Sequence, residues 1–581
     1  MRLLKTGNLQ FEEFYGSETP AYAVLSHRWR EPELSYQDIC RIIENGNVLH
    51  EPRTSSYDKI MNSRAQARGS GYQYIWVDTC CIDKASSAEY QEAINSMWQW
   101  YAESAVCYAY LDDVDLPKLP KAPRKFRHKV YKNLLRSEWF TRGWTLQELL
   151  APKSLIFFDR NWNTIGNSLD LRPSILRITG IDLQHIRNSQ DQGGLDLFKH
   201  RIGRRMSWAS RRDTKRVEDR AYSLLGIFNV NMAMLYGERE RAFARLQEEI
   251  LKCNEDASIL VWTYQEGDVE FAPNGLAPSA THFYSYRQLV QGCRSRRSQC
   301  NVAIVNLDFQ MKPRGLLAAP KVWADPLDEH RAYIILAEDR QGSRSQRVLV
   351  TPIMYTNISQ GQEHASDCVR YANPLWAGSN IVKSAVPMPL CFVRRAQAVR
   401  PSRAFDGFSL GSLVWADFAT TFTYPLQTQG HRRHFPVVLK GSAEQSRFGQ
   451  TRHTFVLEMQ RRTDPGCRIV ILVDYRAWKQ KIARDTEVTL SFYRSRKRLD
   501  LGLAIRLAKE KRNRHHLASC ELLDDSGRRI PTDRVISISS FSNQWLDEGD
   551  DDDGHPKPRQ IMPPVTRSLC AAHIDYGSKT E

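Results

Sequence analysis

Three segments in the first 150 residues combine residue types that can bind or act on a ligand. Residues 25–29 have the sequence LSHRW, residues 76–84 have WVDTCCIDK, and residues 137–149 have SEWFTRGWTLQEL. In the third segment Trp144 and Glu148 are four residues apart, which predicts one shared helix face. An aromatic ring beside a carboxylate can raise the pKa of the acid by excluding water, and can also stack on a planar ligand. The three segments are therefore the candidates for a functional site.

Each candidate also has a purely structural interpretation, which the sequence leaves open. Asp78 fits a cap for the turn that follows it, and Ser26 fits a cap for backbone groups. Glu148 alone fits a solvated position on its helix. More typical of a buried core than of a ligand site are Trp76, Trp98, Trp139, Trp144, Cys80 and Cys81.

An alternation of strands and helices must position these segments. Short apolar runs predict strands at residues 22–26, 74–78, 105–111 and 155–159. Helical patterns and a proline-containing loop separate them, with helices at 36–44, 89–103 and 137–150 and the loop at 117–132. Strands without polar alternation, separated by helices, predict a parallel sheet covered on both faces, the doubly wound α/β class. Ligands of such sheets bind outside the carboxyl ends of the strands, where the first two segments lie.

The rest of the chain changes in character twice. Residues 163–255 predict helices, above all at 217–236 and 238–252, where apolar residues recur at helical spacing. From about residue 258, short β-rich runs between turns predict an antiparallel sandwich or barrel. These runs are 302–309, 332–336, 347–350, 413–418, 437–440, 455–459, 469–473 and 488–492. The predicted parts are an α/β domain (1–160), a helical connecting region (161–257), a β-rich regulatory or recognition domain (258–545) and a disordered acidic tail (546–581).

Composition excludes several classes of protein. Apolar residues make up 41% of the 581 residues, and aromatic residues 10%, which excludes a largely disordered chain. We expect no membrane span and no secretory signal, because no apolar run is long enough. The cysteines form no C-x-x-C pair, so we expect reduced thiols, no zinc site and a cytoplasmic protein.

The net charge of +16 raises the question of nucleic-acid binding. The basic residues are spread over residues 118–132, 201–220 and 495–514, and an acidic run at 547–553 opposes them. Scattered basic loops are more typical of solvated surface than of a polyanion-binding face. The sequence also has no P-loop, no G-x-G-x-x-G, no G-x-S-x-G and no H-E-x-x-H motif.

Taken together, the three segments resemble the fungal heterokaryon-incompatibility (HET) domain family. The resemblance rests on MRLL at residues 1–4, YAVLSHRW at 22–29, WVDTCCIDK at 76–84 and RGWTLQE at 142–148, in the family's order and spacing. A second tract resembles the segment that follows such domains in a large subgroup of these proteins, with MSWA at 206–209, EDRAYSLLGIF at 218–228 and LYGE at 235–238. The chain departs from the family pattern at Arg30, where glycine is usual, and at Lys84, where glutamine is common.

The resemblance implies a role in fungal non-self recognition and induced cell death. It also implies a distant similarity to Toll/interleukin-1 receptor (TIR) domains, which have a flavodoxin-like parallel sheet. In enzymatic TIR domains, the glutamate of a W-x-x-x-E-L helix cleaves the nicotinamide bond of NAD. The sequence WTLQEL at residues 144–149 matches that pattern, and Leu25-Ser26 matches the end of the first TIR strand.

If this chemistry operates here, the resemblance assigns it to particular residues. Glu148 would stabilise or trap the ribosyl centre that forms when nicotinamide leaves. Trp144 or Trp29 would stack on a ring of the dinucleotide, and Ser26 or Arg28 would contact ribose or phosphate. Asp78 completes the predicted binding set. We expect NAD as a substrate, no tightly bound cofactor and no metal.

Three functions are compatible with the sequence. The first is a TIR-like, NAD-consuming effector of cell death. The second is a non-enzymatic signalling module that self-associates through the N-terminal domain, with an incompatibility protein as its partner. The third, nucleic-acid binding, is the weakest, because the basic runs hold few aromatic residues and no known nucleic-acid-binding motif. The sequence does not name the trigger, the oligomeric state or the role of the β-rich domain.

Overall fold

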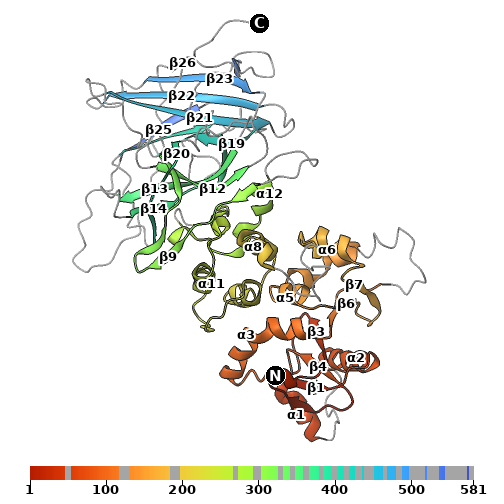
Figure 1. Ribbon diagram of the computed structural model, residues 1–581. Coiled ribbons are helices and arrows are strands. Elements are labelled where there is room, and N and C mark those ends of the chain that lie inside the picture. The colour runs from red at the N-terminus through yellow and green to blue at the C-terminus, as the bar shows by residue number, and fades with distance from the viewer. Residues whose placement is uncertain are drawn as a thin grey trace, which may run out of the picture. The chain divides into compact units, whose positions relative to one another are not determined.

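The computed structural model describes most of the first 394 residues and selected strands thereafter (Figure 1). The described residues are 1–45, 54–116, 131–183, 197–265, 268, 272–291, 302–324, 331–339, 347–357, 365–378 and 384–394, followed by the strands between residues 404 and 574. The chain forms two compact units. The first comprises Met1–Ile259 and Leu276–Arg287, and the second Leu260–Gly275 and Gln288–Glu581.

A mixed seven-stranded sheet forms the centre of the first unit, in the order β2-β1-β4-β3-β5-β6-β7. Its strands are β1 (Arg2–Lys5), β2 (Phe11–Glu13), β3 (Tyr22–His27), β4 (Tyr74–Val77), β5 (Val106–Tyr110), β6 (Leu155–Phe158) and β7 (Thr164–Asn167). The four strands expected from apolar runs are present, and they are parallel to one another. The antiparallel strands β1, β2 and β7 at the two edges were not predicted, because they are short and only partly buried.

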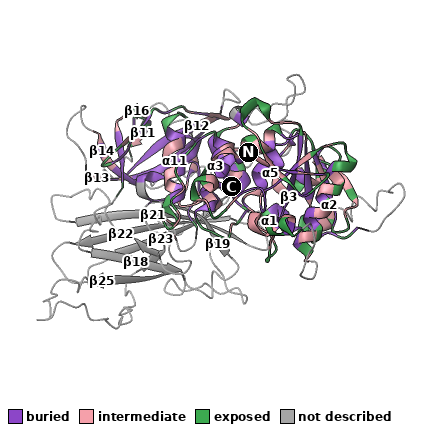
Figure 2. Ribbon diagram, turned by 90° about the horizontal axis from the view of Figure 1, so that it is seen from below, coloured by how far each residue is buried: buried purple, intermediate pink, exposed green. Residues whose placement is uncertain are grey.

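The order of the parallel strands creates a switch point beside β3. Along the sheet they follow in the order second, first, third and fourth in the chain, as in flavodoxin-like sheets. The chain therefore passes from β3 to β4 on one side of the central strand, and then from β4 to β5 on its other side. All six residues of β3 are buried, so this strand is the core of the unit (Figure 2).

Helices surround this sheet in the first unit (Figure 1). They include α1 (Tyr36–Glu44), α2 (Ser55–Gly69), α3 (Ser87–Glu103), α5 (Thr145–Leu150) and α6 (Arg172–Thr179). Helix α1 begins with a capping box in which Ser35 and Asp38 satisfy each other's backbone N–H groups. Helix α2 was not predicted, because its buried face includes Ser56, Lys59 and Ser63 and so carries no apolar period.

The continuous helix predicted at residues 137–150 is wrong. The segment forms a 3₁₀ turn, η2 (Glu138–Thr141), and the separate short helix α5. Between them the Gly143 N–H donates to the Asp213 carbonyl (2.8 Å), and the Asp213 N–H donates to the Thr141 carbonyl (2.7 Å). These bonds take the backbone out of the helical pattern. A Cβ at Gly143 would overlap the Thr214 side chain, so glycine allows the close approach.

The long helix predicted at 217–236 is also wrong, because two short helices, α9 (Asp219–Tyr222) and α10 (Leu225–Phe228), replace it. Helix α8 (Ile202–Ala209) precedes them, and α11 (Arg241–Lys252) follows. Asn229 adopts a left-handed conformation (φ 53°) that ends α10, and Gly237 (φ 103°) lies before α11. Helix α11 confirms most of the helix predicted at 238–252, and its buried residues include Phe243, Leu246 and Ile250.

The second unit is rich in β-structure, as predicted. Its ten-stranded sheet has the order β16-β11-β12-β13-β14-β17-β10-β9, with β15 paired to β13 and β8 to β12. The bounds are β8 (Val302–Ile304), β9 (Phe309–Lys312), β10 (Gly315–Ala318), β11 (Lys321–Ala324), β12 (Arg331–Asp339), β13 (Arg347–Asn357), β14 (Ser366–Arg370), β15 (Leu375–Gly378), β16 (Val386–Pro387) and β17 (Leu390–Val393). The short helix α12 (Tyr286–Gln291) precedes β8.

Two further sheets lie beyond residue 394, in the orders β20-β18-β25 and β19-β21-β22-β23-β24, with β26 paired to β23. Their strands are β18 (Ala404–Leu410), β19 (Phe418–Tyr424), β20 (Phe435–Val437), β21 (Gln450–Arg461), β22 (Arg468–Trp478), β23 (Glu487–Ser495), β24 (Leu517–Ser519), β25 (Ile536–Ser542) and β26 (Ala572–Ile574). The sandwich or barrel stays a prediction, as do the domain boundaries at 160 and 545. Most of the predicted loop 117–132, the strand 413–418 and the tail 546–581 lies outside the described residues.

Arg370 holds the second unit together at one point of its core. Its buried guanidinium donates to the backbone carbonyls of Leu260 (2.9 Å), Ala372 (3.3 Å) and Trp262. It also lies 3.7 Å from the centre of the Trp262 ring. The cation therefore joins the last residue of β14 to residues 260–262 by hydrogen bonds and stacking. Over the described part of the chain, none of the helices has the length and apolarity to cross a membrane.

Packing of α10 on α3 gives a test of this fold. A Cβ at Gly226 would overlap the Trp98 side chain, so we expect Gly226→Ala to destabilise the protein by about 1 to 3 kcal/mol, despite the better helix propensity of alanine. The measurement is the thermal unfolding midpoint. Gly69→Ala is the matched control, because nothing lies within 4 Å of the added Cβ. Equal midpoints for the two variants would contradict this packing.

Candidate functional site

The predicted site residues come from the carboxyl ends of neighbouring parallel strands and from α5. Ser26 is the fifth residue of β3, and Asp78 directly follows β4. Leu25 pairs with Val77 in the parallel register. The next residues along the two strands, Ser26 and Asp78, therefore lie side by side at the carboxyl ends of β3 and β4. Glu148 lies in α5, all six residues of which are buried. The switch point of the sheet therefore coincides with these residues.

A buried hydrogen bond joins Glu148 to the central strand. The Ser26 hydroxyl donates to Glu148 Oε2 at 2.5 Å, and the Trp139 Nε1–H donates to the Ser26 hydroxyl at 2.8 Å. Glu148 is 4% exposed, and Ser26 is fully buried. The solvated position that the sequence left open for Glu148 is therefore wrong. The aromatic ring next to this pair is Trp139, which the sequence assigned only to the core.

The environment of Glu148 favours its protonated form. The pKa of Glu148 is raised to about 8, mainly by burial and also by the negative charge of Asp78. The hydrogen bond from Ser26 and the positive charges of Arg142 and Arg212 act in the opposite direction. Carboxyl groups with raised pKa values are typical of functional sites, where they can change protonation near neutral pH.

Trp29, Asp78 and Lys84 form a second cluster at the ends of β3 and β4. The Trp29 Nε1–H donates to Asp78 Oδ2 at 2.9 Å, and Lys84 Nζ lies 3.8 Å from the centre of the Trp29 ring. Burial is the main cause of a raised pKa for Asp78, and it also lowers the pKa of Lys84. Because the charge of Asp78 acts on Glu148, the two clusters belong to one electrostatic site.

His27 is a member of this site that sequence reasoning missed. Its ring is buried, with Nδ1 3.8 Å from Asp78 Oδ1 and Nε2 4.0 Å from Glu33 Oε2. Neither ring nitrogen has a hydrogen-bond partner among the described residues. Burial holds the pKa of His27 well below its usual value, so the ring is neutral. The signal was present, since His27 lies inside the LSHRW segment.

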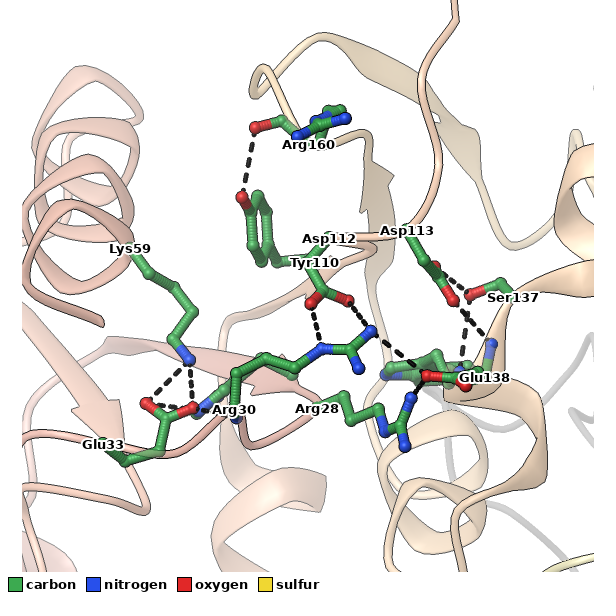
Figure 3. Close-up of polar contacts among 12 residues, drawn as sticks. Arg28, Arg30, Glu33, Lys59, Tyr110, Asp112, Asp113, Ser137, Glu138 and Arg160 are labelled. Carbon is green, nitrogen blue, oxygen red and sulfur yellow. Dashed lines mark hydrogen bonds and ion pairs between the residues drawn. The ribbon is translucent and has the colours of Figure 1, made fainter. Parts of the chain in front are cut away.

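Arg28 belongs to a partly exposed ion-pair network at the rim of the site, not to the buried Ser26–Glu148 pair (Figure 3). Its guanidinium pairs with Glu138, which also lies 3.1 Å from Arg30 Nη2. Arg30 Nε in turn contacts Asp112 Oδ2 at 2.5 Å. The network joins the segments that follow β3 and β5 to η2. Arg30, the departure from the family pattern, is thus a central member of it.

Trp144 and Glu148 do not share partners, although they are four residues apart. The Trp144 indole N–H points to Asp219 Oδ2 (3.3 Å), which lies in α9. Asp219 also accepts from the Tyr236 hydroxyl (3.0 Å), and Tyr236 stacks on Tyr90. Trp144 therefore contacts the segment that follows the sheet, while Glu148 contacts β3.

The remaining candidates have structural positions. Trp76 and Trp139 are fully buried, as are Cys80 and Cys81, which confirms their core interpretation. Trp98 and Trp144 are half-buried. Within the described part of the chain, no cluster of three or more histidine, cysteine, aspartate or glutamate residues could hold a metal ion.

The raised pKa of Glu148 makes a prediction for stability. Between pH 4.5 and pH 8 the folded protein keeps a proton that the unfolded chain releases, so the contribution of Glu148 to stability falls as pH rises, by about 1.4 kcal/mol per unit. Glutamine cannot ionise. We therefore expect Glu148→Gln to gain thermal stability relative to the wild type as pH rises from 5.5 to 9.

Glu218→Gln is the matched control for this experiment. Backbone N–H groups, including those of Gly237 and Arg239, donate to the Glu218 carboxylate and lower its pKa. The ionisation of Glu218 therefore changes stability only below pH 4.5. The difference in thermal stability between Glu218→Gln and the wild type should stay constant from about pH 5.5 to 9. A constant difference for Glu148→Gln as well would contradict the raised pKa.

Comparisons with known proteins agree with the resemblance seen in the sequence. Residues 22–130 match the family described as heterokaryon incompatibility protein (HET). The chain is 41% identical over 263 residues to the vegetative incompatibility protein HET-E-1 of Podospora anserina. That match covers 44% of this chain and 18% of the relative, so the chain spans much less than the whole of that protein. No solved structure matches. The N-terminal part of the chain is therefore a heterokaryon-incompatibility domain.

Proposed function

We propose that this chain is an effector of heterokaryon incompatibility in fungal non-self recognition and cell death, and that its N-terminal unit cleaves NAD at the nicotinamide bond, as enzymatic TIR domains do. The HET domain and the similarity to a vegetative incompatibility protein support the first part. The second part rests on the site.

The observation that carries the enzymatic proposal is the position of Glu148. Its carboxyl group is hydrogen-bonded to Ser26 at the carboxyl end of β3, beside the switch point of the sheet. Ligands of flavodoxin-like sheets bind at this point. The carboxyl group also has a pKa shifted toward neutrality by burial, which is typical of a reacting group.

The chemistry needs a carboxylate more than an acid. Nicotinamide leaves NAD as a neutral molecule, and the ribosyl centre that remains carries positive charge. An ionised Glu148 would stabilise this centre or form a bond to it, after which water completes the hydrolysis. Arg142 and Arg212 favour the ionised form, as does the Ser26 hydrogen bond. The positive charge of the bound nicotinamide ring would favour it further.

The surrounding residues supply binding groups in this proposal. Trp29 is half-buried and offers a ring for stacking, with Asp78 holding its indole nitrogen. Trp144 offers a second half-buried ring. Arg28 and Ser26 remain the proposed contacts to phosphate and ribose. Arg28 would have to exchange its partner Glu138 for the substrate.

One observation favours the non-enzymatic alternative, a signalling module that acts by self-association. Glu148 is 4% exposed, and its carboxyl group already has a hydrogen-bond partner in the protein, Ser26. A substrate can reach the carboxylate only after the residues around it move. A module that never opens would use Glu148 as a structural group alone.

Nicotinamide release by the purified full-length chain tests the proposal. We expect Glu148→Gln to lower the rate of release from NAD by at least about a hundredfold, because the positive ribosyl centre loses its carboxylate. Glu249→Gln is the matched control, since Glu249 lies in α11 and pairs with Lys252. Its rate should equal that of the wild type. No release from the folded, concentrated wild-type chain would favour the signalling module.

The pH dependence of the reaction gives a second test. A carboxylate with a pKa of about 8 is mostly protonated at pH 7, so we expect the rate at low substrate to rise about tenfold per pH unit between pH 6 and pH 7.5. The rate should then level off above pH 8. A rate that is flat over this range would contradict a reacting carboxylate with a raised pKa.

A further inference from the structure

Arg212 lies after α8, outside the matched HET region, and reaches back to the turn that begins α5. Its Nη1 donates to the carbonyl of Arg142 at 2.9 Å and to the hydroxyl of Thr145 at 2.8 Å. Thr145 is the first residue of α5, and its hydroxyl donates to the carbonyl of Trp139 at 2.5 Å. One guanidinium therefore holds the segment that connects Trp139 to the helix of Glu148.

The backbone next to Arg212 is fixed against the same turn. Asp213 makes two backbone hydrogen bonds with residues 141–143. Because Gly143 leaves no room for a Cβ beside Thr214, the two segments are in close contact. Arg212 thus lies on a rigid support rather than on a free loop.

The guanidinium of Arg212 is buried, and its acceptors among the described residues are a carbonyl and a hydroxyl rather than a carboxylate. Its Nη2 has no acceptor among the described residues, although Arg212 is only 7% exposed. The pKa of Arg212 is lowered to about 9, mainly by burial, with the charge of Glu148 acting in the opposite direction. A buried cation of this kind is costly unless a negative charge lies near it. The ionised form of Glu148 supplies that charge.

Groups from several elements act on the Glu148 carboxyl. Asp78 after β4 disfavours its ionised form, while Arg142 and Arg212 favour that form. Ser26 at the end of β3 donates to it, and it raises the pKa of Tyr101 in α3. Removal of Arg212 would leave only Arg142 and the Ser26 hydrogen bond, among these groups, to act against the burial and Asp78.

We propose that Arg212 is a positioning residue for Glu148: it fixes the turn that starts α5 and brings a buried positive charge to the site. The catalytic part of this inference rests on the proposed function. The geometric part does not, because the contacts of Arg212 are independent of any substrate. The site then includes the segment after α8 as well as β3 and α5.

Infrared spectroscopy of the full chain tests the inference without a substrate. The carbonyl band of protonated Glu148 is obtained as the difference between each protein and the same protein carrying Glu148→Gln, over pH 6 to 10. We expect Arg212→Gln to move the midpoint of this band upward, by less than the loss of the Ser26 hydrogen bond or of Arg142 would. Arg212→Lys, which keeps the charge, should restore most of the wild-type midpoint.

Arg205→Gln is the matched control. Arg205 is another buried arginine of the first unit, and it donates to the Ile227 carbonyl at 2.9 Å. The carboxylate that acts on it is Asp256. Its loss should lower stability without moving the Glu148 midpoint. If Arg212→Gln also leaves the midpoint unchanged, or if Arg205→Gln moves it equally, the inference is wrong.

Nicotinamide release separates this inference from the proposed function. If the chain cleaves NAD, Arg212→Gln should shift the pH dependence of the rate in the alkaline direction and lower the rate at pH 7. If the wild-type chain releases no nicotinamide, the enzymatic proposal fails. The infrared midpoint then still decides whether Arg212 controls the charge of Glu148.

Discussion

The hydrogen bond between Ser26 and Glu148 links the central strand of the first unit to α5, and the site depends on it. A carboxyl group buried at this depth is costly when ionised, because it loses its water. Ser26 offsets part of this cost, and the Trp139 indole holds the serine in place. The positive charges of Arg142 and Arg212 offset another part. The balance leaves a group that can change its charge near neutral pH, which a fully solvated glutamate would not do.

The cost of burying charged groups also explains the arrangement at the carboxyl ends of the strands. Asp78 and Glu33 lie 3.8 and 4.0 Å from the His27 ring, and burial keeps that ring neutral. Lys59 pairs with Glu33 at 2.6 Å, so the acidic side of this cluster has its own cation. The ion pairs of Arg28 and Arg30 lie outside it, where solvent screening makes each of them weak. The strongest interactions are therefore those nearest to the carboxylate, and the weakest lie at the rim.

The segment after the sheet is part of this arrangement. Arg212 and Asp213 hold the turn before α5, and Asp219 holds the Trp144 indole. Residues 212–219 thus fix the turn before Glu148 and the indole of Trp144, and all of these groups lie after the HET match at 22–130. The relative from Podospora anserina matches this chain over more residues than the HET match covers.

The sequence by itself determined the four parallel strands, the placement of the candidate residues Ser26 and Asp78 at their carboxyl ends, and the change to β-structure after residue 258. Continuous apolar runs specify buried strands locally, and parallel strands must end at the same edge. Only the tertiary structure decided that α5 is a separate short helix, that Trp139 rather than Trp144 lies next to Ser26, and that His27 is buried. Ser26 and Glu148 are 122 residues apart in the chain. Spacing describes neighbours on one helix or strand, whereas partners at such separations are chosen by the packing of the whole unit.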